Sequence, residues 1–247
     1  MALTTLIMAA GKGTRMKSDL AKVLHTLNGH PMIHYVIRLA RDLSSERIIA
    51  IIGHQKDRVR EVLAGEHIEF VVQEPQLGTG HAVMQASDLL KSYHGDVLVL
   101  SGDVPVLTLE TLKCLLQEHS ASKAVATMLT TRLPDPTGYG RVLRKADGSV
   151  RKVVEHKDAT DEEKKITEIN SGIYVFSSQL LFDALKRIDS NNAQKEYYLP
   201  DVLKIFIADG RLVRSYSTTD ALEISGINTT EQLRAAEAIL KNRSKEI

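Results

Sequence analysis

Short apolar runs alternate with longer amphipathic stretches along the first half of the chain. Residues 3–9 form an apolar run that ends at a glycine-rich segment, which is typical of a buried parallel strand. Strands joined by helical crossovers give an α/β fold, and we expect a Rossmann-like, three-layer, mostly parallel sheet. In chain order the pattern predicts strands at residues 3–9, 47–52, 68–72, 96–100 and 124–129, and helices at 31–43, 57–63, 81–91 and 109–119.

The pattern changes after residue 130. Prolines and glycines crowd residues 134–140, and an Asp-Gly pair at 147–148 predicts a hairpin turn between short strands at 141–143 and 150–154. We therefore interpret residues 131–176 as a small antiparallel insertion. The remaining pattern predicts helices at 179–188 and 199–208, a strand at 212–216 and a closing helix at 229–245.

The segments together indicate one domain with a short appendage. We expect a domain at residues 1–228, followed by a linker-like helix at 229–247. The closing segment has none of the six-residue periodicity of a left-handed β-helix.

Composition narrows the class of protein. With 247 residues, 43% of them hydrophobic, the chain can bury a full core. Thirty-two Lys and Arg residues against 31 Asp and Glu leave a net charge of +1, so we expect no nucleic-acid partner. The one cysteine, Cys114, lies in an apolar helical stretch and suits a reducing compartment. Without a signal peptide or a long apolar span, we expect a soluble, cytoplasmic protein with no membrane contact.

Candidate chemistry begins in the loop after the first strand, which reads AAGKGTRM at residues 9–16. Its small residues allow successive backbone N–H groups to turn toward one anion. The spacing fits neither a dinucleotide fingerprint nor a Walker A loop. Lys12, Arg15 and Lys22 follow this loop and could surround phosphates. The alternative is a tight strand-to-helix turn with incidental basic residues.

Further blocks follow in order along the chain. They read QEPQLGTGHA at 73–82, GDVP at 102–105, TGYGR at 137–141, VEHKDA at 154–159, EINSG at 168–172 and GIN at 226–228. Together with the glycine-rich loop, they resemble the sugar nucleotidyltransferases, in particular the uridylyltransferase half of bacterial bifunctional N-acetylglucosamine-1-phosphate uridylyltransferase/glucosamine-1-phosphate acetyltransferase. The resemblance covers essentially the whole chain. The family's acetyltransferase β-helix, which carries its trimerisation surface, has no counterpart here, so we expect a monomer.

The resemblance implies an activity. It is the transfer of a uridylyl group from UTP to N-acetylglucosamine 1-phosphate with Mg²⁺ as cofactor and pyrophosphate as the second product. UDP-N-acetylglucosamine would serve cell-wall biogenesis as a peptidoglycan and lipopolysaccharide precursor. Two alternatives stay open: a nucleotidyltransferase for another nucleotide and sugar phosphate, and a catalytically silent nucleotide-binding regulatory subunit.

The resemblance also implies roles for single residues. Catalysis is expected of Arg15 and Lys22, and metal binding of Asp103 and Asn228. Sugar contacts are expected of Gly140, Glu155 and Asn170. Nucleotide contacts are expected of Met8, Ala9, Ala10, Gly11, Gly13, Gln73, Gln76, Gly78, Thr79, Ser101 and Gly102.

Residue chemistry agrees with these roles but leaves simpler alternatives. The amide of Gln73 has a donor and an acceptor, as the edge of a pyrimidine requires. Asp103 ends a strand at the carboxyl edge of the sheet and suits a hard cation, although it could simply cap a loop. Asn228 taken alone is typical of a helix N-cap. Gly140 could serve only a hairpin, and Glu155 could be an exposed charge.

Overall fold

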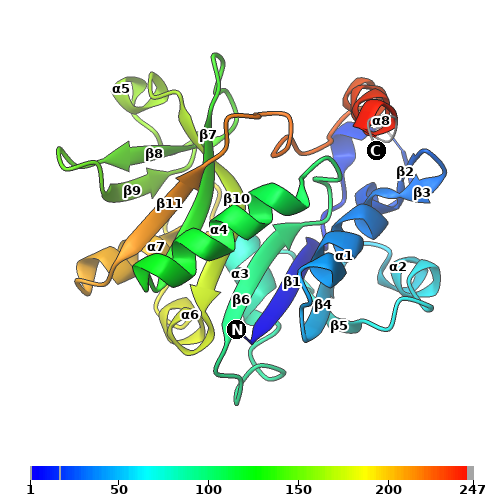
Figure 1. The fold of residues 1–247 in the computed structure, drawn as a ribbon, viewed down its shortest axis with the longest axis horizontal. Coiled ribbons are helices and arrows are strands. Elements are labelled where there is room, and N and C mark those ends of the chain that lie inside the picture. Colours follow the sequence, from blue (N-terminus) through cyan, green and yellow to red (C-terminus); the bar gives the residue numbers. More distant parts are fainter. Residues whose placement is uncertain (1, 17, 244–247) are drawn as a thin grey trace.

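The apolar runs form a central sheet with helices on both faces (Figure 1). The computed structural model describes residues 2–16 and 18–243. The strand order is β11-β7-β10-β6-β1-β4-β5, and neighbours are parallel except where β10 lies antiparallel to both β6 and β7. The strands are β1 (Leu3–Ala9), β4 (Arg47–Ile52), β5 (Glu69–Val72), β6 (Asp96–Ser101), β7 (Ala126–Arg132), β10 (Glu168–Ser177) and β11 (Val213–Ser217).

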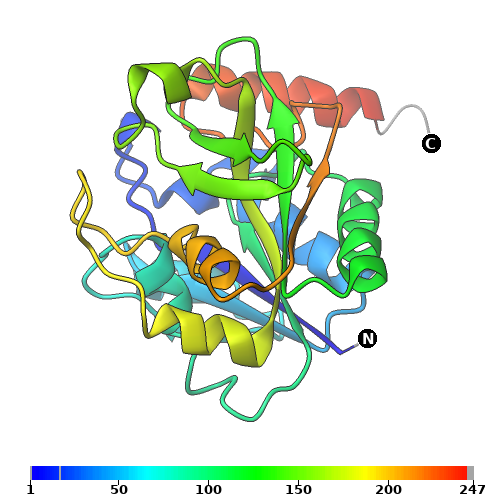
Figure 2. The ribbon, with the colours of Figure 1, turned by 90° about the vertical axis from the view of Figure 1, so that its left-hand side faces the viewer.

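Two apolar layers separate the sheet from its helices. Successive residues of β1 point to opposite faces, so Leu6 joins one layer and Ile7 the other. The first layer is covered by α3 (Thr79–Met84), α6 (Ser178–Leu185) and α7 (Asp201–Ala208), and the second by α1 (Met32–Asp42), α2 (Lys56–Val62) and α4 (Leu109–Ser122). Figure 2 shows α4 on one side of the sheet and α6 and α7 on the other. The predicted three-layer, mostly parallel α/β fold is confirmed.

Strand β10 is the main element that the sequence pattern did not predict. It pairs with β6 and β7 in the middle of the sheet, so the range 131–176, expected to form an insertion, includes most of a central strand. The expected hairpin is present as β8 (Gly140–Arg144) and β9 (Val150–Val154), and it is followed by the short helix α5 (Asp161–Lys164). Because β8 also pairs with β10, the hairpin is attached to the central sheet through that strand.

Some predicted boundaries also differ. The helix predicted at 81–91 ends at Met84, and turns continue beyond it. The Ser87 hydroxyl donates to the Met84 carbonyl at 2.5 Å, a local bond that competes with helix continuation. Between β1 and α1 the chain forms short elements that the hydrophobic pattern did not predict. They are η1 (Thr14–Met16), η2 (Lys22–Leu24), β2 (Thr26–Leu27) and β3 (His30–Pro31).

The closing helix α8 (Thr230–Arg243) packs beside β2, and residues 244–247 of the predicted helix and linker lie outside the described residues. Leu27, Met32 and Val106 form a small apolar cluster with Ile227 and Ala236. Helix α8 is therefore anchored to the segments that follow β1 and β6. In the described part of the chain, no helix combines the length and apolar character required to cross a membrane.

We expect Phe206→Ala to destabilise the fold strongly. Phe206 on α7 is 2% exposed, and its ring centroid lies 6.4 Å from that of Phe176 on β10. Truncating a buried phenylalanine typically costs roughly 3–5 kcal/mol. Urea denaturation should show this loss, whereas Leu222→Ala, at a side chain that is 54% exposed, should stay within roughly 0.5 kcal/mol of wild type. Equal losses in the two variants would contradict the assignment of the core.

Candidate functional site

The site lies at the carboxyl edge of the central sheet. Strands β1 and β6 run in parallel with Met8 opposite Ser101, so the segments that follow them leave the sheet side by side. The N–H of Gly102 donates to the Met8 carbonyl at 2.9 Å and ties the two segments together. The glycine-rich loop and the Gly-Asp-Val-Pro block, far apart in the sequence, therefore meet at one place.

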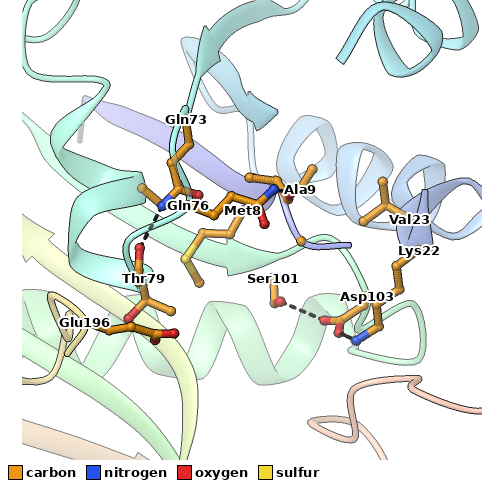
Figure 3. A pocket seen from close by; sticks show the side chains of 14 residues that line it. Met8, Ala9, Lys22, Val23, Gln73, Gln76, Thr79, Ser101, Asp103 and Glu196 are labelled. Atoms are coloured by element: carbon orange, nitrogen blue, oxygen red, sulfur yellow. Dashed lines mark hydrogen bonds and ion pairs between the residues drawn. The ribbon is translucent and has the colours of Figure 1, made fainter. Parts of the chain in front are cut away.

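A cluster of charged and polar side chains joins these segments to the entry of α8. The Nζ of Lys22 donates to Asp103 Oδ2 and, at 2.6 Å, to Asn228 Oδ1. Arg15 Nη2 donates to the same Asn228 oxygen at 2.7 Å, and Ser101 Oγ donates to Asp103 Oδ1 at 2.6 Å. Figure 3 shows Lys22 and Ser101 on either side of the Asp103 carboxylate. The residues expected to act in catalysis and in metal binding thus form one connected group.

Asn228 reaches this group because the helix that follows is capped by another residue. The Thr229 hydroxyl accepts from the Gln232 N–H at 3.2 Å, and Gln232 Oε1 accepts from the N–H groups of Thr229 and Asn228. The interpretation of Asn228 as the helix N-cap is therefore wrong. Its side-chain oxygen is instead directed to Lys22 and Arg15.

The oxygen atoms of the cluster fit a hard divalent cation. Asp103 Oδ2 and Asn228 Oδ1 both accept from the ammonium of Lys22, so they already face one positive centre. Carboxylate and amide oxygens are ligands that Mg²⁺ accepts. Within residues 2–16 and 18–243 no group of three or more His, Cys, Asp or Glu side chains could hold a metal. Mg²⁺ commonly binds through one or two protein oxygens and completes its shell with water and substrate phosphates.

A cavity of about 330 Å³, here called the central cavity, opens beside the cluster. Most of its lining residues belong to the predicted nucleotide-binding set. Val23, Ala82 and Glu196 line it as well, although they were not among the predicted site residues. The predicted residues that line it are Met8, Ala9, Ala10, Gly11, Lys22, Gln73, Gln76, Gly78, Thr79, Ser101 and Asp103.

The glycine-rich loop is open to an anion. The N–H groups of Gly11, Lys12 and Gly13 have no acceptor within the described residues. Gly13 has a φ of +64°, and a Cβ there would lie 2.6 Å from Lys22 Cβ. Gly13, which does not line the central cavity, therefore allows the stem of Lys22 to pack against the loop.

Gln73 is buried and its amide is held in one orientation. Its Nε2 donates to the Gly78 carbonyl at 2.8 Å and lies 3.3 Å from Nδ1 of His81. Burial lowers the pKa of His81, so its neutral ring can accept this second bond. With Nε2 engaged, Gln73 offers a ligand its carbonyl oxygen, rather than the donor and acceptor expected from the sequence. Gln76 instead donates to the Ala10 carbonyl and supports the loop.

A second cavity of about 180 Å³, here called the hairpin cavity, lies between β8, β10 and the start of α7. It is lined by the three predicted sugar-binding residues Gly140, Glu155 and Asn170. Met8 and Thr79 line both cavities, so the two are neighbours. No site role was predicted for the other lining residues, which, apart from Met8 and Thr79, are Gly138, Tyr139, Ser171, Gly172, Tyr174, Leu199 and Pro200.

Comparison with known proteins identifies the family. The model of the nucleotidyl transferase family matches residues 4–222. The chain belongs to the nucleotidyl transferase family. Its polar cluster and both cavities are built from residues of this matched region, except Asn228, which follows it.

Curated relatives and solved structures agree with this membership. The chain is 48% identical over 241 residues to bifunctional protein GlmU of Halalkalibacterium halodurans and 50% identical over 241 residues to that of an Exiguobacterium species. Each alignment covers 98% of this chain but 53% of the relative, so the chain spans about half the length of these curated relatives.

Two solved structures share the fold at low identity. One is a UDP-glucose pyrophosphorylase complexed with UDP-glucose, with 17% identity, a TM-score of 0.76 and coverage of 98% of this chain and 100% of that one. The other is a proposed glucose-1-phosphate thymidylyltransferase from Bacillus anthracis, with 20% identity, the same TM-score and coverage of 98% and 96%.

We expect Gly78→Ala to destabilise the loop before α3. Gly78 has a φ of +106°, and a Cβ there would lie 2.6 Å from the Tyr197 carbonyl oxygen. Strain of this kind costs roughly 1–3 kcal/mol, which chemical denaturation can measure. Gly65→Ala is the matched control, because a Cβ at Gly65 meets nothing within 4 Å. If Gly78→Ala were as stable as this control, the loop would not require glycine.

We expect Glu155→Gln to stabilise the protein at neutral pH. Burial raises the pKa of the Glu155 carboxyl, and the carboxylates of Asp158 and Asp201 raise it further. When the pKa of a carboxyl is higher in the folded state than in the unfolded state, the free energy of unfolding falls as the pH rises above the unfolded pKa of about 4.3. The advantage of the variant in urea denaturation should therefore disappear as the pH falls toward about 4. A variant less stable than wild type at pH 7 would contradict this sign.

Proposed function

We propose that the protein transfers a uridylyl group from UTP to N-acetylglucosamine 1-phosphate and releases pyrophosphate. The observation that carries the proposal is the convergence of Lys22, Asp103 and Asn228 beside an open glycine-rich loop. The identity of 48% to bifunctional protein GlmU over 98% of the chain supports the choice of substrates. A cytoplasmic location remains part of this proposal.

In this proposal UTP occupies the central cavity. The N–H groups of Gly11, Lys12 and Gly13, for which the described part of the chain supplies no acceptor, would hold phosphate oxygens, with Arg15 nearby as a cation. Gln73 Oε1 can accept from the imide N–H of uracil, a donor that cytosine lacks at the same ring position. The N–H of Gly78, which has no acceptor within the described residues, can donate to a uracil carbonyl oxygen.

The acceptor sugar phosphate would occupy the hairpin cavity, with its phosphate toward Met8 and Thr79, which line both cavities. A phosphate oxygen of the acceptor attacks the α-phosphorus of UTP. The bond from that phosphorus to the bridging oxygen breaks, and its electron pair leaves with pyrophosphate. The reaction requires no side-chain nucleophile, and the protein contributes by positioning the two phosphates and stabilising charge.

In the proposed reaction the residues of the cluster have different roles. Mg²⁺ held by Asp103 and Asn228 would neutralise negative charge on the phosphates. Ser101 keeps the Asp103 carboxylate oriented, and the ammonium of Lys22 is close enough to serve a phosphate instead of the carboxylate it now contacts. Arg15, which is exposed at the mouth of the loop, is suited to the departing pyrophosphate.

Pyrophosphate release tests the proposal. Purified protein is incubated with UTP, N-acetylglucosamine 1-phosphate and Mg²⁺, with EDTA and acceptor-omission controls. We expect release that depends on both the metal and the acceptor. A nucleotide panel follows: preference for CTP, GTP or dTTP would overturn the uridine assignment, and UTP binding without release for any acceptor would indicate a silent nucleotide-binding subunit.

We expect Lys22→Ala and Arg15→Ala each to lower turnover. Removing one preorganised charge contact typically reduces kcat by roughly 10²–10³-fold. Lys113→Ala, at an exposed lysine on α4, is the matched control and should keep wild-type turnover. Steady-state kinetics with UTP and the acceptor would measure the effect. Near-normal turnover in both site variants would refute the catalytic assignment.

A further inference from the structure

Tyr174 lines the hairpin cavity, and the proposed function does not use its hydroxyl. Its side chain is 1% exposed and stands on β10, four residues after Asn170. Its ring stacks on Phe176 with centroids 5.3 Å apart, and Phe176 in turn contacts Phe206. Three aromatic rings thus lie in a row, and the hydroxyl of the first, Tyr174, contacts Asn170, which also lines the cavity.

Strand β10 is irregular between Asn170 and Tyr174. Asn170 pairs with Thr130 and Tyr174 with Met128, so β10 advances four residues where β7 advances two. Bulges of this kind redirect side chains and are common beside functional sites. Here the irregularity leaves both Asn170 and Tyr174 at the hairpin cavity.

Hydrogen bonds fix which partner donates. The N–H of Gly172, which can only donate, lies 3.2 Å from Asn170 Oδ1, so the Asn170 amide must direct its Nδ2 to the Tyr174 hydroxyl at 2.6 Å. The Tyr174 oxygen therefore accepts a bond, and its own proton has no acceptor within the described residues. Burial raises the pKa of Tyr174 above its ordinary value, so the hydroxyl keeps that proton at neutral pH.

A buried donor without a partner is costly, and a phenylalanine would complete the row of aromatic rings without it. The cavity places this donor together with Glu155, whose carboxylate can only accept. An acetamido group has one of each: an N–H for the carboxylate and a carbonyl oxygen for the hydroxyl. The pair thus matches the substituent that distinguishes N-acetylglucosamine from glucose.

We propose that the Tyr174 hydroxyl donates a hydrogen bond to the acetamido carbonyl oxygen of the acceptor sugar and so selects N-acetylated hexosamine phosphates. The inference rests on the proposed function and adds a specificity-determining residue to it. It predicts that the contribution of the hydroxyl depends on the acetamido group, and not on the sugar or phosphate in general.

The test compares two acceptors in two proteins. Wild type and Tyr174→Phe are assayed with N-acetylglucosamine 1-phosphate and with glucose 1-phosphate. We expect the variant to lose roughly three- to tenfold in kcat/KM for the first acceptor, mainly through KM, with the KM of UTP unchanged. For glucose 1-phosphate we expect no change; if it is not turned over, its inhibition constant serves as the readout. Tyr93→Phe is the matched control, because Tyr93 precedes the first residue of β6, whereas the site lies beyond its last residue.

The outcomes distinguish a failure of the role proposed for Tyr174 from a failure of the proposed function. If wild type uses N-acetylglucosamine 1-phosphate but the variant keeps the same preference between acceptors, the role of Tyr174 is overturned and the proposed function stands. Equal losses for both acceptors would also overturn it, because they would indicate a structural effect through Asn170. A wild type inactive with both acceptors would overturn the proposed function and this inference with it.

Discussion

The ammonium of Lys22 binds together three segments that lie far apart in the sequence: the loop after β1, the end of β6 and the entry of α8. The side chains of Lys22 and Asp103 are only 13% and 16% exposed, so either charge left alone would be poorly solvated. Surrounding backbone holds the pair in place, since the Asp103 carbonyl accepts from the Ile227 N–H at 2.9 Å. The geometry of the site depends on keeping this contact.

Much of the fold could be predicted because burial imposes a simple pattern on parallel strands. β1, β4 and β6 are mostly apolar because both faces of the sheet are covered there, although β1 includes Thr4 and Thr5. β10 is also covered on both faces, but its first half carries polar residues at Asn170 and Ser171, which line a cavity. Polar residues that line a cavity therefore interrupt the apolar pattern by which the other strands were predicted.

Part of the site could also be predicted from the sequence. The glycine-rich loop and Asp103 stand directly after predicted strands, where topology alone brings residues to one edge. Tyr174 was not found, because an aromatic residue in an apolar strand looks like core until the direction of its hydroxyl is known. The single orientation of the Gln73 amide, set by Gly78 and His81, is likewise visible only in three dimensions.

Because Asn228 stands 206 residues after Lys22, the site has an order of assembly during synthesis. At roughly 5–20 residues per second, roughly 10–40 s separate the appearance of these two residues. Near the end of that interval, once β11 (Val213–Ser217) has been made, the growing chain has all the strands of the sheet, but Leu27, Met32 and Val106 still lack the cover of Ile227 and Ala236. The nascent chain must therefore keep an apolar patch beside its unfinished site until α8 emerges and closes both.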